Sequence, residues 1–180
     1  FKPAGGATGV ALNTNITITF SEAVRLINGA ELTDANVDGL ITLKDTDASG
    51  ADIAFDATIN AGKTVITINP DSDFSSEQVL YVAIGATVED TSDNAITASN
   101  AMFTAADTTP PAGSISINNN AAYTNSDSVT LNLSASDNPS GVSRMMISNS
   151  SAFENASWED YATSKSWTLT SGDGTKTVYV

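Results

Sequence analysis

The stretch Ile16-Thr17-Ile18-Thr19-Phe20 alternates apolar and polar side chains with a period of two. This period is typical of a β-strand that packs one face on a core and exposes the other face to water. The same alternation returns at residues 53–59, and it is most regular at residues 129–135. The pattern therefore predicts an all-β protein.

Further strand-like runs extend outward from this stretch at the spacing of a two-sheet sandwich. They comprise residues 40–44, 64–69, 79–88 and 101–105, with a weak strand before Leu12. The long connection from residue 21 to residue 39 interrupts the pattern. Within it, residues 33–37 could form one helical turn, with Thr33 or Asp34 as the N-cap.

A five-residue joint, Asp107-Thr108-Thr109-Pro110-Pro111, separates this first set of strands from a second set. Paired prolines fix φ, remove two backbone donors and hold the preceding residue extended, so neither a strand nor a helix runs through the joint. We therefore expect two domains, residues 1–107 and residues 108–180.

The second domain is predicted to be an incomplete sandwich. Its strand-like runs are residues 114–117, 129–135, 144–148, 166–170 and 175–180. The sequence Ser171-Gly172-Asp173-Gly174 predicts a tight turn between the last two, because glycine adopts positive φ at little cost. Since the chain stops inside a strand-like run, we expect an open sheet edge and a missing closing strand.

The composition excludes several classes of function. The chain has 21 acidic and seven basic residues, a net charge of -14, which argues against binding to a phosphate backbone, so no nucleic-acid partner is expected. It has no cysteine and no histidine, so oxygen-bound hard cations are the plausible metals. No apolar run approaches the roughly 20 residues that span a bilayer, so no direct membrane insertion is expected.

The first domain carries most of the acidic residues, 15 of the 21. If successive strands of a seven-stranded sandwich alternate in direction, four of these acidic residues gather at the chain-entry end of this domain. These four candidate calcium ligands are Glu22, Glu89, Asp90 and Asp93. The alternative is that each acidic side chain is singly solvated in a turn, where aspartate is common.

A second group of candidate calcium ligands is expected at the joint. By the same alternation, Asp71 and Asp73 lie at the exit end of the first domain, near Asp107, and Asp137 of the second domain falls close to them. Calcium takes six to eight oxygen ligands. The sequence Asp71-Ser72-Asp73 lacks the glycine and the glutamate of an EF-hand loop, so a site here would be assembled from separate loops.

The second domain contains the aromatic residues Tyr123, Trp158, Tyr161 and Trp167. Trp158 and Tyr161 could form an exposed platform for a sugar ring, although packing is the alternative for Trp158 because tryptophan buries a large area. Trp167 alternates with Leu169, so it is expected in the core.

The run from Gly6 to Val24 resembles the opening of the bacterial Ig-like domains of surface-layer proteins and large surface adhesins. The resemblance continues through residues 64–70, 81–84 and 89–94, and it covers residues 3–106. It implies an Ig-like β-sandwich that serves as an extracellular spacer, an adhesin segment or an accessory domain.

Residues 109–180 resemble a second bacterial Ig-like or fibronectin-like repeat that lacks its final strand. The similarity lies in residues 109–111, 129–131, 136–142 and 172–180. Together, the two resemblances imply two tandem Ig-like β-sandwich domains, the second truncated.

The expected function is a non-catalytic structural spacer or stalk of a secreted or cell-surface bacterial protein. Its partners would be neighbouring Ig-like domains of the same chain, with calcium stiffening the joint. The alternative is an adhesin or carbohydrate-binding module that binds a cell-surface or polysaccharide ligand through Trp158 and Tyr161. The sequence has no histidine base, no Gly-x-Ser-x-Gly elbow and no phosphate-binding loop, so an enzyme is not expected.

Overall fold

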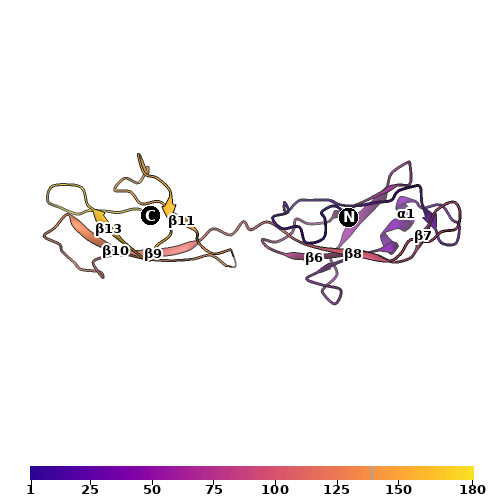
Figure 1. Ribbon diagram of the computed structural model, residues 1–180, viewed down its shortest axis with the longest axis horizontal. Coiled ribbons are helices and arrows are strands. Elements are labelled where there is room, and N and C mark those ends of the chain that lie inside the picture. The colour runs from indigo at the N-terminus through magenta and orange to yellow at the C-terminus, as the bar shows by residue number, and fades with distance from the viewer. Residues whose placement is uncertain (139) are drawn as a thin grey trace. The chain divides into compact units, whose positions relative to one another are not determined.

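The structure is a computed structural model that describes residues 1–138 and 140–180. It divides into two compact units, unit 1 (Phe1–Thr108) and unit 2 (Thr109–Val180), each built mainly of β-strands (Figure 1). The boundary expected from the sequence lies one residue earlier, between Asp107 and Thr108. The prediction of an all-β chain is confirmed, because among the described residues only residues 34–40 are helical.

Unit 1 contains two three-stranded antiparallel sheets and a short ribbon. One sheet has the order β1 (Ile16–Thr19), β5 (Val65–Pro70), β4 (Phe55–Ile59). The other has the order β3 (Ile41–Asp45), β6 (Val79–Ile84), β8 (Ser99–Thr104). The ribbon pairs β2 (Arg25–Leu26) with β7 (Val88–Glu89). The N-terminal segment joins both sheets, because Lys2 bridges to Thr17 and Val10 bridges to Ala105.

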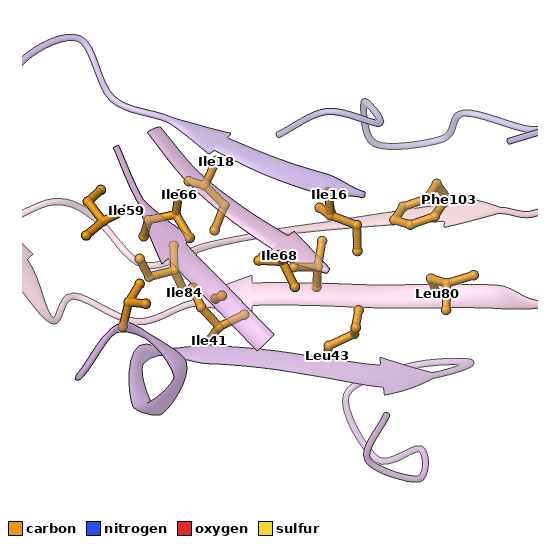
Figure 2. Close-up of a cluster of buried hydrophobic side chains, with 14 of the residues drawn as sticks. Ile16, Ile18, Ile41, Leu43, Ile59, Ile66, Ile68, Leu80, Ile84 and Phe103 are labelled. Carbon is orange, nitrogen blue, oxygen red and sulfur yellow. The ribbon is translucent and has the colours of Figure 1, made fainter. Parts of the chain in front are cut away.

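The core of unit 1 lies between the two sheets. Figure 2 shows Ile18 and Ile66 of one sheet and Ile41 of the other among the side chains that meet there. Phe103 of β8 is buried and packs edge-on against Phe74, with ring centroids 6.0 Å apart. Because apolar side chains alternate along each strand, they all point to the core from one face of the sheet. Each large apolar side chain that is fully buried contributes about 1.5–3 kcal/mol to the stability of the fold.

The helical turn expected at residues 33–37 is present as α1 (Asp34–Val37), which continues into the 3-10 helix η1 (Asp38–Leu40). Its start is fixed by the backbone N–H of Thr33, which donates to Asn36 Oδ1 at 2.8 Å. Val37 is fully buried in the core of unit 1, so packing holds a helix that is too short to be stable alone.

The two helical segments also cover a sheet edge. β4 is the outer strand of its sheet, and two of its N–H groups point away from β5. Asp34 Oδ1 accepts the N–H of Ile59 at 2.8 Å, and Asp38 Oδ1 accepts the N–H of Ala57 at 2.8 Å. Because residues four apart lie on one face of a helical turn, the two carboxylates match N–H groups two residues apart on the strand.

Unit 2 has one three-stranded sheet and a smaller one. The larger sheet has the order β13 (Ser164–Thr168), β10 (Ser128–Ser136), β9 (Ala112–Ile117) (Figure 1). The smaller pairs β11 (Arg144–Met145) with β12 (Glu159–Asp160), and Ser148 forms an isolated bridge with Tyr179. Of the predicted elements of this unit, only the run 136–142 includes a residue, Pro139, outside the described residues.

The structure corrects the sequence-based assignment in several places. The run 79–88 forms two strands, β6 and β7, rather than one. The sequence pattern did not predict β2, which pairs with β7, or β12, which pairs with β11. Both of these strands have two residues, which is too short to show a period. Residues 171–174 connect β13 to the segment around Tyr179, which forms only an isolated bridge with Ser148, so the connection is not a hairpin. The strand predicted at residues 175–180 is reduced to this one bridge.

Candidate functional site

Three of the four acidic residues expected at the entry end of unit 1 belong to the β2–β7 ribbon and the loop after it. Arg25 lies opposite Glu89 in the ribbon, and its Nε donates to Glu89 Oε1 at 3.1 Å. The same guanidinium forms an ion pair with Asp93. Glu89 is 6% exposed, so Arg25 supplies the positive charge that this buried carboxylate requires.

The carboxylate of Asp90 is bound within its own loop. Oδ1 accepts the N–H groups of Ser92 at 2.7 Å and Asn94 at 2.9 Å, and Oδ2 accepts Asn94 Nδ2 at 2.8 Å. These hydrogen bonds, first of all that from the Asn94 side chain, lower the pKa of Asp90 below its ordinary value of 3.8. Glu22, the fourth residue of the group, lies exposed in a bend before β2.

Of the four acidic residues expected at the joint, Asp107 and Asp137 each accept a hydrogen bond from a nearby serine. Asp71 and Asp73 are exposed, and Asp107 Oδ1 accepts a hydrogen bond from Ser76 Oγ at 3.2 Å. Asp137, in unit 2, is half-buried, and its Oδ2 accepts a hydrogen bond from Ser140 Oγ at 3.1 Å. Its Oδ1 is buried and has no hydrogen-bond partner among the described residues.

Within residues 1–138 and 140–180, no group of three or more acidic side chains is placed so that it could hold a metal ion. Calcium binding therefore stays a prediction of the sequence. In the same described residues, none of the helices has both the length and the apolar character needed to cross a membrane.

The aromatic pair expected to bind a sugar lines an apolar groove of unit 2, with a volume of about 390 Å³. Trp158 is 59% exposed there, whereas Tyr161 is half-buried. Tyr161 Oη accepts the backbone N–H of Ala135 at 2.8 Å, which fixes the ring against β10. The two residues thus share one site, and only Trp158 presents most of its surface to solvent.

A second and more polar groove of unit 2, with a volume of about 570 Å³, lies beside Trp167. Trp167 packs against the core of this unit, as predicted, and its Nε1 donates to Asn149 Oδ1 at 2.8 Å. Lys165 and Glu159 form an ion pair at the same groove. Sequence reasoning missed the role of Asn149, because residues 18 apart on different elements leave no local pattern.

The family comparison concerns unit 1. Residues 1–105 match the family model described as bacterial Ig-like domain. A comparison with solved structures matches the chain to the crystal structure of the S-layer protein rSbsC(31-844), at 14% identity and a TM-score of 0.40. The match covers 81% of this chain and 20% of that one. No curated protein matches the chain.

Proposed function

The chain belongs to the bacterial Ig-like domain family, and from this premise we propose that it is a non-catalytic structural module that spaces the parts of a secreted or cell-surface bacterial protein. Its neighbours along the polypeptide would be further domains of the same kind. A spacer needs units that fold independently and resist extension, rather than a reactive cleft.

The observation that carries this proposal is the separation of the hydrophobic cores. The nineteen buried apolar residues of the first cluster all lie in unit 1, and the seven of the second cluster all lie in unit 2. Each unit therefore buries its own apolar surface, which is the property expected of a module in a series.

Single-molecule stretching between residues 1 and 180 tests the proposal. We expect two separate unfolding events that release up to about 380 Å and about 250 Å of extended chain, because 108 and 72 residues extend by up to about 3.5 Å each. One merged event, or extension without force peaks, would contradict a load-bearing spacer.

Calcium stiffening is a further part of this proposal. Small-angle scattering of the protein in EDTA and in millimolar calcium chloride would compare the distributions of intramolecular distances. We expect calcium to narrow the distribution if carboxylates such as Asp107 and Asp137 share an ion. An identical distribution in both buffers would remove calcium from the proposal.

A second candidate function is carbohydrate binding through Trp158 and Tyr161. The observation that favours it is the exposed indole of Trp158 at the mouth of a groove, since aromatic faces are amphipathic binding surfaces. A glycan array with the intact protein tests it, with Trp158→Ala as the disabled variant. Tyr123→Ala is the matched control, because Tyr123 is 93% exposed and does not line this groove.

A further inference from the structure

The N-terminal segment of unit 1 runs beside β8, the last strand of that unit. Val10 and Ala105 form a parallel bridge, and within the part of the chain that the structure describes every other bridge and strand pair is antiparallel. Parallel neighbours begin at the same end of the pairing and finish at the same end. The chain therefore enters this pairing at one end and leaves β8 at the opposite end.

Four backbone hydrogen bonds hold the N-terminal segment to β8 and the residues that follow it, and we call these four bonds the β8 clamp. They are Gly6 N–H to Met102 C=O at 2.7 Å, Thr104 N–H to Ala7 C=O at 2.8 Å, Val10 N–H to Thr104 C=O at 3.2 Å, and Ala106 N–H to Val10 C=O at 2.7 Å. The clamp thus spans residues 6–10 of the segment and residues 102–106 at the end of unit 1.

Backbone bonding holds the segment more than apolar burial does. Of residues 1–10, only Pro3 is buried, and the apolar side chains of the segment that pack against the core are partly exposed. At its start the segment has one further pair, in which Lys2 and Thr17 exchange two backbone hydrogen bonds at 2.8 and 2.9 Å. The segment can therefore separate from β8 without the core between the two sheets opening first.

The direction of the pairing decides how the clamp responds to force. When the two ends of unit 1 are pulled apart, the segment is drawn backward and β8 forward, so the strands slide along each other and all four bonds are loaded together. Terminal strands in an antiparallel pair would be pulled from the same end, and their bonds would open in turn. On its other side β8 pairs with β6 over six residues, Ser99 to Thr104, so the clamp is the weaker contact of β8.

We propose that the β8 clamp is the force-bearing contact of unit 1: it resists extension until its four bonds break together, and its rupture starts the unfolding of this unit. The proposal rests on the spacer function, because it concerns how a spacer withstands tension. It adds the residues that carry the tension and the one direction in which unit 1 is strong.

The test compares two pulling directions on the intact protein. The chain has no cysteine, so introduced pairs of cysteines define the points of attachment. Lys2→Cys with Thr108→Cys loads the clamp in the sliding direction, whereas Asn13→Cys with Thr108→Cys pulls from the end where Val10 meets Ala106. All three positions are exposed, so the attachments leave the core intact.

We expect the unfolding force of unit 1 in the second direction to be about half of that in the first or less, because each hydrogen bond is then loaded alone. The released lengths identify both events as unit 1. They should be up to about 370 Å and about 340 Å, because residues 2–108 and 13–108 extend by up to about 3.5 Å each.

The variant Val10→Pro removes the N–H that bonds Thr104. We expect it to lower the force in the sliding direction by about a quarter, because one of the bonds that are loaded together is lost. Val10→Ala keeps this N–H and is the matched control. Leu32→Ala is a second control: its side chain is fully buried away from the clamp, so it should weaken unit 1 in urea and leave the force unchanged.

The NMR ring signals of Tyr81 report that unit 1 stays folded in each variant. Equal forces in the two directions would overturn the clamp, and a force peak in both would leave the spacer function standing. Forces that follow stability in urea across Val10→Pro, Val10→Ala and Leu32→Ala would also overturn the clamp, because the core would then set the resistance. Extension without a force peak in either direction would contradict the spacer function and the clamp together.

Discussion

Unit 1 and unit 2 differ in how much apolar surface they bury and in how they finish their sheets. Nineteen buried apolar residues belong to the 108 residues of unit 1, against seven among the 71 described residues of unit 2. In unit 1 the carboxylates of Asp34 and Asp38 accept N–H groups at the edge of β4, whereas in unit 2 the phenol oxygen of Tyr161 accepts the N–H of Ala135 in β10. A sandwich is thus finished by its edge contacts as much as by its core.

The largest expected effect comes from breaking one core at a time. Phe103→Ala removes a buried ring from unit 1 and should cost about 3–5 kcal/mol of unfolding free energy, whereas Leu131→Ala in unit 2 should cost about 2–5 kcal/mol. Both tryptophans lie in unit 2. Urea unfolding followed by tryptophan emission should therefore shift for Leu131→Ala alone.

Phe103→Ala should instead shift the transition reported by the NMR ring signals of Tyr81 in β6. If either substitution moved both transitions by the same amount, the two cores would be one cooperative system and the comparison between the units would fail. Ile27→Ala is the control, because Ile27 is 55% exposed and its loss should cost less than about 0.5 kcal/mol.

Breaking one ion pair in each unit gives the next largest effect on the free energy of unfolding. Arg25→Met leaves the carboxylate of Glu89, 6% exposed, without its partner and should cost about 1–3 kcal/mol. Lys165→Met breaks the pair with Glu159 in unit 2, where both side chains are about one-third exposed, and should cost less than about 1 kcal/mol. If urea unfolding gave the same loss of stability for both variants, the burial of Glu89 would not explain the cost of Arg25→Met.

Removing the carboxylates that cover the edge of β4 in unit 1 gives a smaller expected effect on stability. Asp34→Ala deprives the N–H of Ile59 of its acceptor, and Asp38→Ala does the same for Ala57. Because both carboxylates belong to exposed residues and water replaces them in part, each change should cost about 1 kcal/mol. The measurement is amide exchange, which should speed up at Ile59 alone in Asp34→Ala and at Ala57 alone in Asp38→Ala.

Strand alternation made most of the fold predictable from the sequence. The runs around Ile16, Leu43 and Leu131 each have one inward face, so the alternation within a short run indicates which of its side chains face the core. The ribbons escaped prediction because β2 and β12 have two residues each. The edge contacts of Asp34 and Asp38 were not predicted either. They depend on which strand the fold places beside α1, and that strand, β4, is about 20 residues away along the chain.

The candidate sites were predictable only in part. The alternation of strand directions grouped Glu89, Asp90 and Asp93, and these residues do belong to one ribbon and its loop. The basic residue that neutralises two of them, Arg25, came from a strand that the pattern did not reveal. Trp158 and Tyr161 are neighbours in sequence, so their shared groove was within reach of a local argument.

The smallest expected effect is a pH dependence that distinguishes a turn held by a carboxylate from a turn held by an amide. In unit 1 the carboxylate of Asp90 binds its loop, whereas in unit 2 the amide of Asn118 accepts the N–H of Thr130 at 2.8 Å. Folding lowers the pKa of Asp90, so its contribution to stability is present above the ordinary value of 3.8 and is lost as the pH falls through the lowered value. The turn at Asn118 has no titrating group and should not respond.

An NMR titration from pH 6 to pH 2 measures this difference. The Asp90 carboxyl carbon should titrate with a midpoint below 3.8, and Asn94→Ala should move the midpoint upward, because the Asn94 side chain is the largest cause of the lowered pKa. The amide order parameters of Ser92 and residue 94 should fall in the same pH interval, while those of residues 118–120 stay constant. A midpoint at 3.8 in the unmodified protein would mean that the charged carboxylate of Asp90 does not stabilise the turn. The loop of unit 1 would then be held without a charged group, as the turn at Asn118 in unit 2 is.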